Sequence, residues 1–326
     1  MPILEILIFI SSCLVIILSS RWVIDSLSKL ARSLGWKEYV VAFFTVSLGA
    51  VLPEFTIGIR SALGGVPELS LGNIMGQNII LLTFAVAVCT LVVRGIIVQS
   101  RTVRTGATFA AFAVTLPFIL LHDGVLSRID GLILILSFGF YVFWLFGKDD
   151  RFVKNYEKSA KKIEKKAGYL KHIGISIASF LLVVLSAEGI VYSAKEFALI
   201  LDVPEGLIGI LLVGAGVALP EIYFSLKLAT KGRSWMILGG LTGAVAISST
   251  LVLGSVALVN PIVLSDPPHL TSSPYFISMM FLVFSGVALW FFVRTNNKLT
   301  KKEAIYLFLI YFTFLISELY FGELFL

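Results

Sequence analysis

The sequence predicts an all-α integral membrane protein with ten transmembrane helices, arranged as two five-helix repeats of inverted topology. Three observations lead to this prediction. The chain is too apolar for a soluble domain, its basic residues fall in alternate connections between apolar segments, and one short motif occurs twice at a fixed distance. Together they define the class of fold before any residue is assigned a chemical role.

Composition identifies the lipid bilayer as the main solvent of the chain. Of its 326 residues, 58% are hydrophobic and 14% are charged, and the mean hydropathy is +0.96. Soluble domains carry about 25% charged residues. A helix that crosses a bilayer needs about 20 apolar residues. Ten segments of roughly this length are found: 3–20, 39–63, 70–93, 105–121, 130–147, 172–200, 206–229, 235–260, 273–293 and 304–322.

The first apolar segment is predicted to be a retained helix rather than a cleaved signal peptide. Its first charged residue is the acid Glu5, and it has no small-residue cleavage site. The two cysteines, Cys13 and Cys89, both fall within predicted spans. Neither a disulfide framework nor a paired-cysteine metal site is therefore expected.

The lysines and arginines predict how the chain is oriented in the membrane. All but three of the 26, namely Arg60, Arg128 and Lys195, fall in alternate connections between the predicted spans. Cytoplasmic connections carry the excess of basic residues. We therefore expect a multi-pass protein of the plasma membrane with extracellular N- and C-termini. Because the net charge of +6 is spread over separate connections, nucleic acid is not an expected partner.

An internal repeat divides the chain into two halves. Residues 49–54 read GAVLPE and residues 216–221 read GVALPE, 167 positions later, and the same offset relates residues over about 50 positions. Since each half has five spans, the second copy must enter the membrane in the opposite direction. The predicted units are residues 1–147, a mixed-charge cytoplasmic linker at 148–171, and residues 172–326.

Two glutamates of the repeated motif are the main candidates for binding a cation. Glu54 and Glu221 lie near the middle of their spans, where a carboxylate must be paired, protonated or bound to a cation. Each follows a proline, which cannot donate to the carbonyl four residues earlier. Those carbonyls belong to Gly49 and Gly216. Such oxygens suit Na⁺, Ca²⁺ or a similar hard cation, and a protonated glutamate in helix packing is the structural alternative.

The next span of each half is predicted to face these carboxylates. In the first half it carries three amides, Asn73, Gln77 and Asn78, and in the second half it is nearly apolar until Ser248. Buried amides need partners, and a cation is one of several that would serve. Glycines recur in both spans, but they are equally typical of close helix packing.

Other acidic residues are interpreted structurally. Glu188 is predicted to pair with a basic group near a helix bend, and Glu5 and Glu318 are predicted to reach water at the membrane ends. The segment 22–34 has apolar residues at helical spacing with basic residues between them. It fits either a moving gate or the interfacial end of a tilted helix.

With these motifs the sequence resembles the alpha repeats of the cation/calcium exchanger superfamily, especially the prokaryotic sodium/calcium exchangers. The resemblance rests on G-x-x-L-P-E followed by G-N-x-x-G in two halves, and it covers essentially the whole chain. It implies that Glu54 and Glu221 bind Ca²⁺ and share the coupling Na⁺ ions. It also implies carbonyl ligands in the turns that end at Gly49 and Gly216. Polar ligands are implied in the next span of each half, at 72–81 and 239–248.

The sequence departs from that family around the carboxylates. Positions where the family carries hydroxyls that help to bind sodium are occupied by other residues: Ala50, Val51, Val217, Ala218, Gln77 and Ala244. The glutamate of the proton-coupled pattern, G-N-x-x-E, is replaced by Gly76. Fewer sodium ions per calcium, a proton carried by Glu54 or Glu221, and a different transported cation are all compatible with these changes.

The function predicted from the sequence is a secondary active cation antiporter that works by alternating access. Its transported ions are Ca²⁺ and Na⁺ (or H⁺), and no cofactor is expected. A proton-coupled or other-cation antiporter, a cation channel and a non-transporting relative are the alternatives. No mid-span histidine–glutamate metal motif, nucleophile–base pair or phosphate loop occurs, so an enzyme is not expected. The expected partners are the lipid bilayer and inorganic cations, and a monomer is compatible with the sequence.

Overall fold

A computed structural model describes residues 2–33, 49–98, 101–147, 166–230, 234–264, 275–295 and 298–322. This part of the chain is largely helical, which confirms the predicted fold class at that level. Eight of its helical segments are long and apolar enough to cross a membrane: Ile3–Val23, Pro67–Val92, Val103–Asp123, His172–Leu201, Glu205–Thr230, Met236–Val259, Phe276–Thr295 and Lys301–Tyr320.

The second and fifth predicted spans are not among these eight segments. The second span begins outside the described residues, and its described part is the 15-residue helix α3 (Gly49–Leu63). The fifth span corresponds to α7 (Arg128–Gly147), which has 20 residues. The count of ten spans therefore stays a prediction. The predicted linker at 148–171 lies outside the described residues as far as 165.

In the first half, three of the helices form one continuous rod with a π-helical turn in its middle. These are α4 (Pro67–Ile80), the turn η2 (Leu81–Ala85) and α5 (Val86–Val92). The remaining elements of this half are α1 (Pro2–Ser33), β1 (Ile96–Ile97), α6 (Arg101–Leu120), η3 (Leu121–Asp123) and β2 (Val125–Leu126), followed by α7.

The second half contains two rods of this kind. The first consists of α10 (Glu205–Ile208), the π-helical turn η4 (Gly209–Val213) and α11 (Gly214–Thr230). The second consists of α12 (Ser234–Ile247), the π-helical turn η5 (Ser248–Val252) and α13 (Leu253–Val259). The remaining elements are α9 (Lys166–Leu201), β3 (Ile262–Val263), α14 (Phe276–Thr295), β4 (Lys298–Leu299) and α15 (Lys301–Gly322).

The sequence repeat is also a repeat of elements. The rod α12–η5–α13 begins and ends 167 residues after the rod α4–η2–α5, and its π-helical turn falls at the same place. The helices α7 and α15 begin with the same capping box, in which a hydroxyl residue and an acid three positions later satisfy each other's backbone N–H. Ser127 N donates to Asp130 Oδ2 at 2.9 Å, and Thr300 N donates to Glu303 Oε2 at 2.6 Å.

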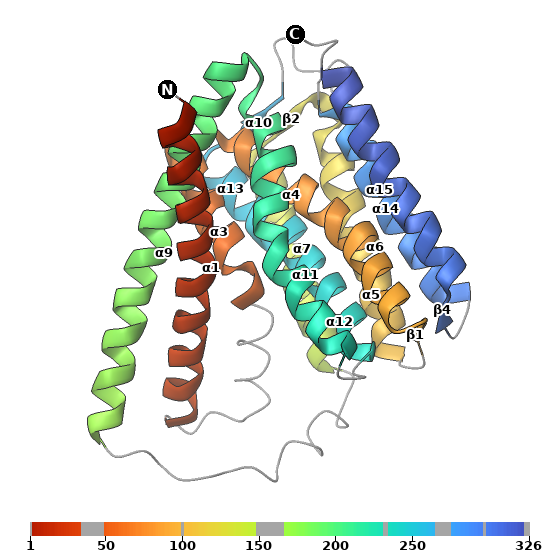
Figure 1. Cartoon of the computed structure of the whole chain (residues 1–326), viewed down its shortest axis with the longest axis horizontal. Coiled ribbons are helices and arrows are strands. Elements are labelled where there is room, and N and C mark those ends of the chain that lie inside the picture. The colour runs from red at the N-terminus through yellow and green to blue at the C-terminus, as the bar shows by residue number, and fades with distance from the viewer. Residues whose placement is uncertain are drawn as a thin grey trace.

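Two short antiparallel strand pairs join the halves to each other. β1 pairs with β4, with Ile96 opposite Leu299. β2 pairs with β3, with Val125 opposite Val263. The two pairs lie at opposite ends of the helices (Figure 1). The halves are therefore linked by backbone hydrogen bonds as well as by helix packing.

The helices are arranged around the buried rod α4–η2–α5. In Figure 1, α1 and α9 stand together on one side of the molecule, α14 and α15 stand on the opposite side, and α4 and α11 lie between them. Nearly every residue of α4 is buried. The start of α1 and the end of α15 lie at the same end of the molecule (Figure 1), as expected for an even number of crossings.

Helices α1 and α9 pack along each other as a pair. Gly189 of α9 lies against Ser12 of α1, with no room for a larger residue, and the rings of Phe9 and Phe197 meet edge to face with centroids 5.7 Å apart. The helix α1 does not end at residue 20, where the first span was predicted to end, but continues to Ser33. As a result, Arg21 belongs to the candidate span Ile3–Val23 and not to a connection.

Candidate functional site

Glu54 lies on α3, directly after the proline inside that helix. Its side chain is 1% exposed. One carboxylate oxygen, Oε1, accepts a hydrogen bond from Gln77 Nε2 of α4. The other oxygen, Oε2, has no hydrogen-bond partner among the described residues. Glu54 and Gln77 were predicted to belong to one site, and the structure brings them into direct contact.

Glu221 occupies the repeat-equivalent position on α11, after Pro220. Its side chain is partly exposed, but its Oε2 atom is buried and has no partner among the described residues. Glu54 and Glu221 are close enough for their charges to interact. Two carboxylates from different halves of the chain therefore share one region of the interior, which is costly unless a proton or a cation offsets their charge.

Two amide side chains one turn apart on α4 carry unpartnered atoms, and one of them, Gln77, contacts Glu54. Both polar side-chain atoms of Asn73 and the Oε1 atom of Gln77 are buried without a hydrogen-bond partner in the described structure. A buried polar atom that lacks a partner costs free energy of about 1–3 kcal/mol. A cation that accepts oxygen ligands would satisfy the oxygens of both amides and both carboxylates.

Asn78 and Ser248, which were also predicted to be ligands, are bonded to each other. Ser248 Oγ donates to Asn78 Oδ1 at 3.0 Å, and Asn78 Nδ2 donates to Ser249 Oγ at 2.9 Å. This network joins α4 to the π-helical turn η5 across the two halves. Each of the three side chains therefore has a hydrogen-bond partner in the other half of the chain.

Gly49 and Gly216 are the two glycines whose carbonyls were predicted to be free. Gly49 is the first described residue of α3. Gly216 lies within α11, where the following Pro220 has no N–H to donate to its carbonyl. A Cβ on Gly216 would lie 3.4 Å from Cys13 Sγ of α1. At this position α1 therefore passes close to the helix that carries Glu221.

Three features near the site were not predicted from the sequence. The π-helical turns η4 and η5 come just before α11 and just after the apolar part of α12, and such turns are frequent at functional sites. Ser70 of α4 is buried with an unpartnered hydroxyl in the described structure. Arg21, on α1, is close enough for its charge to act on Glu221. A charged residue next to a predicted span end was the only signal for Arg21, and Ser70 gave none.

The other acidic residues have different surroundings. Glu188 of α9 forms an ion pair with Arg60 of α3, as its structural interpretation predicted. Glu318 does not reach water: its side chain is 4% exposed, and it accepts a hydrogen bond of 2.6 Å from Ser278 Oγ of α14. The helices α14 and α15 pack face to face at this position, so a residue near a span end is buried by its neighbour.

Replacing Glu188 by glutamine is expected to leave the half-saturating Ca²⁺ concentration for uptake within about twofold of the wild-type value, because a half-exposed ion pair contributes little energy. The measurement is ⁴⁵Ca²⁺ uptake into proteoliposomes over a range of Ca²⁺ concentrations. A loss of saturable uptake in this variant would instead place Glu188 among the cation ligands.

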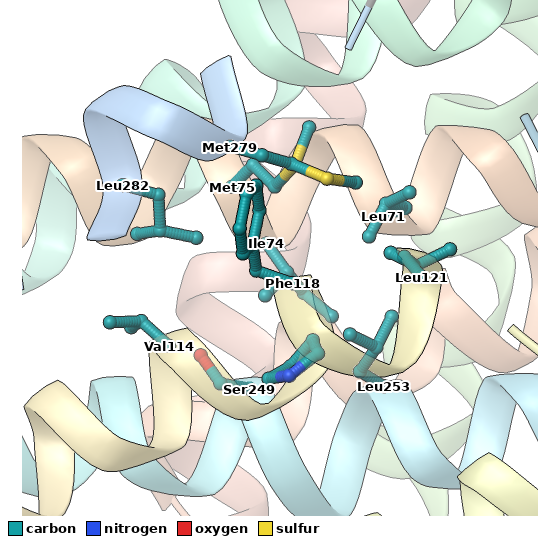
Figure 2. A pocket seen from close by; sticks show the side chains of 11 residues that line it. Leu71, Ile74, Met75, Val114, Phe118, Leu121, Ser249, Leu253, Met279 and Leu282 are labelled. Atoms are coloured by element: carbon teal, nitrogen blue, oxygen red, sulfur yellow. The ribbon is translucent and has the colours of Figure 1, made fainter. Parts of the chain in front are cut away.

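A small apolar cavity lies beside the amide-bearing helix and is distinct from the acidic site. It has a volume of about 20 Å³ and lies between α4, α6, α14 and the rod that contains η5. Figure 2 shows that Ser249 is the one polar side chain among its labelled lining residues: Leu71, Ile74, Met75, Val114, Phe118, Leu121, Ser249, Leu253, Met279 and Leu282. Such a lining offers a cation too few ligands.

Fold and site together define a multi-span helical membrane protein with two nearby carboxylates, the buried Glu54 on α3 and the partly exposed Glu221 on α11. The chain belongs to the sodium/calcium exchanger protein family, which it matches over residues 4–147 and 171–319. The family resemblance stated from the motifs is therefore confirmed. Within the described residues, no group of three or more His, Cys, Asp and Glu side chains is placed to hold a metal ion, so further ligands would have to be amides, hydroxyls or carbonyls.

Individual relatives match the chain over nearly its whole length. It is 26% identical over 318 residues to an uncharacterised membrane protein of Methanocaldococcus jannaschii, covering 96% of this chain and 97% of the relative. It is 21% identical over 350 residues to the sodium/calcium exchanger MaX1 of Methanosarcina acetivorans, covering 96% of this chain and 98% of that protein.

Solved structures of two kinds of exchanger share the fold. The sodium–calcium exchanger NCX_Mj matches with a TM-score of 0.62 and 23% identity, covering 97% of this chain and 99% of the other. The H⁺/Ca²⁺ exchanger CAX matches with a TM-score of 0.73 and 15% identity, covering 97% and 82%. Because the backbone resembles both proteins, the fold alone does not identify the coupling ion.

Proposed function

We propose that this protein is a secondary active cation antiporter of the sodium/calcium exchanger type, with its cation site at Glu54 and Glu221. The observation that carries the proposal is the shared location of these two carboxylates, each on a proline-containing helix and each with an unpartnered buried oxygen in the described structure. A pair of negative charges in a membrane interior is costly unless a cation or a proton neutralises it. In an antiporter, the transported cation and its counter-ion neutralise the pair alternately.

The proposed ligands come from both halves of the chain. Glu54 and Glu221 supply charge, while the side-chain oxygens of Asn73 and Gln77 supply neutral ligands. Gln77 also fixes the orientation of Glu54 by donating to it. The carbonyls of Gly49 and Gly216 are the proposed backbone ligands, because a proline four residues later leaves each without its helical donor. We assign Asn78 and Ser248 to the support of the site, since they are bonded to each other.

The proposed architecture has ten spans in two inverted five-helix halves, 1–147 and 172–326, joined by a cytoplasmic linker. It is supported by the repeated rods, by the strand pairs at opposite ends of the molecule (Figure 1), and by the alternation of basic connections. The same alternation supports a plasma-membrane protein with extracellular termini. In this arrangement the packed pair α1 and α9 slides against the core to open the site to each side alternately.

We propose that fewer than three sodium ions are exchanged for each Ca²⁺. The support is the loss of hydroxyl side chains at Ala50, Val51, Val217 and Ala218, which leaves the carboxylates with fewer neighbours able to bind Na⁺. A proton carried by Glu54 or Glu221 is the second candidate, supported by the likeness of the fold to an H⁺/Ca²⁺ exchanger.

Transport assays test these proposals directly. ⁴⁵Ca²⁺ uptake is measured in proteoliposomes loaded with Na⁺ at fixed pH, beside vesicles that carry only a pH gradient. We expect saturable uptake driven by the sodium gradient. Uptake only with the pH gradient would establish the proton-coupled candidate, and flux that needs no counter-ion would indicate a channel. A measured ratio of three Na⁺ per Ca²⁺ would contradict the reduced stoichiometry, and no uptake under either gradient would contradict Ca²⁺ antiport.

A further inference from the structure

Arg21 is a charged residue within a candidate span, Ile3–Val23. Its side chain is exposed on α1 rather than packed in the core. An arginine at membrane depth is costly unless it faces water or a partner of opposite charge. The effect of this charge therefore depends on which groups lie opposite it on the helices next to α1.

The internal repeat shows that Arg21 has lost the partner its position has in the other half. At the offset of 167, Arg21 corresponds to Glu188, and Arg60 corresponds to Lys227. Glu188 and Arg60 form an ion pair between α9 and α3. The equivalent positions on α1 and α11 hold Arg21 and Lys227, two cations that cannot pair. The ion pair of the second half is therefore not available to Arg21.

The helix contacts place Glu221 within reach of Arg21. The helices α1 and α11 are neighbours that run in the same direction (Figure 1), and they approach closely where Cys13 meets Gly216. From this contact Arg21 is about 12 Å further along its helix and Glu221 about 7.5 Å further along its own, at 1.5 Å per residue.

The remaining offset of about 4.5 Å is shorter than an extended arginine side chain, which leans toward the N-terminus of α1 and therefore toward the level of Glu221. In agreement, Arg21 is among the charged groups near Glu221. Glu221 is partly exposed, unlike Glu54, so it is the less enclosed of the two carboxylates.

We propose that Arg21 is a specificity-determining residue of the cation site, whose guanidinium is a resident positive charge beside Glu221. The inference rests on the proposed function. A fixed charge changes the binding energy of an ion in proportion to the charge of that ion. Arg21 therefore weakens Ca²⁺ binding about twice as much as Na⁺ binding on a logarithmic scale. Its positive charge also neutralises part of the negative charge of the site, which a further sodium ion would otherwise neutralise.

The test compares neutral and charge-conserving variants of the purified full-length protein. Ca²⁺ and Na⁺ binding are measured separately by isothermal titration calorimetry on wild type, Arg21→Gln and Arg21→Lys. We expect Arg21→Gln to lower the dissociation constant by about tenfold for Ca²⁺ and about threefold for Na⁺. Arg21→Lys is expected to keep both values within about twofold, because it keeps the charge.

Two further variants make the result decisive. Arg128→Gln removes the same charge from an exposed residue at the start of α7, a helix that packs against η5 and α13, and is expected to change neither constant. Arg21→Met keeps the aliphatic stem without the charge and replaces Arg21→Gln if that variant does not fold.

The inference is overturned by neutral variants that leave both affinities unchanged, that weaken them, or that strengthen Ca²⁺ and Na⁺ binding by equal factors. A wild-type protein that binds neither ion would instead contradict the proposed function itself. The ⁴⁵Ca²⁺ uptake assay on the same preparations distinguishes that outcome from a failure confined to Arg21.

Discussion

Replacing Glu54 or Glu221 by glutamine is expected to reduce ⁴⁵Ca²⁺ uptake by roughly 100-fold, because each removes a full ligand charge from a site of low dielectric. Glutamine keeps the size of the side chain and its carbonyl oxygen, so the change tests charge rather than packing. The experiment uses proteoliposomes with equal amounts of reconstituted protein and the gradient that drives wild-type uptake.

The two substitutions are expected to differ in their effect on stability. Glu54→Gln keeps an acceptor for Gln77 Nε2, which donates to Glu54 in the wild type. In both variants the interior loses one of two interacting like charges. We therefore expect thermal stability in the absence of Ca²⁺ to be unchanged or increased, while stabilisation by added Ca²⁺ is lost. Such a pattern separates a lost ligand from a misfolded protein.

Glu318 provides a matched control for these variants. It is also a buried carboxylate in a span, but it is bonded to Ser278 between α14 and α15. Glu318→Gln is expected to keep uptake within about threefold of wild type, because a neutral hydrogen bond can replace the charged one. Equal loss of uptake in Glu318→Gln, Glu54→Gln and Glu221→Gln would show that burial of a charge, and not its position, matters.

Replacing Gly76 by alanine is expected to prevent correct packing of the site. The rods α4–η2–α5 and α10–η4–α11 cross with their backbones in contact. A Cβ on Gly76 would collide with the backbone carbonyl of Ile210, and a Cβ on Gly72 with that of Gly206. The partner rod has the same requirement, since a Cβ on Gly214 would lie 2.8 Å from Gln77 N.

Overpacking a core costs about 1–3 kcal/mol when side chains can yield, and here the obstacle is backbone. We therefore expect Gly76→Ala to destabilise the protein by about 3 kcal/mol or more, with loss of the monodisperse peak in size-exclusion chromatography and of Ca²⁺ uptake. Gly139→Ala on α7 is the control. A Cβ at Gly139 meets nothing within 4 Å among the described residues, and alanine favours the helix. Normal folding and transport in Gly76→Ala would refute the close crossing.

This crossing gives the glycines of the first half a structural role. Through this crossing, α4, which carries Asn73 and Gln77, packs closely against the rod that carries Glu221. The residues equivalent to the partner rod, 38–63, belong to the first half, and of these 38–48 lie outside the described residues.

The sequence by itself determined the solvent of this protein, its repeat and its main acidic residues. Hydropathy and the alternation of basic connections are local properties, so most of the described helices could be predicted within a few residues of those observed, whereas α1 continues to Ser33. The offset of 167 between Glu54 and Glu221 paired the two carboxylates before any contact was known. These features depend on the order of residues along the chain and not on how the helices meet.

Only the tertiary structure decided which polar groups are partners. Asn78 and Ser248, both predicted to be ligands, are bonded to each other, and Glu318 is buried against the neighbouring helix α14. The continuation of α1 through Arg21 and the π-helical turns were likewise not foreseen, because a hydrophobic pattern carries no signal for one extra residue in a turn. Pairing energies in a low-dielectric interior depend on distances between helices, and these distances are set by packing that no single segment encodes.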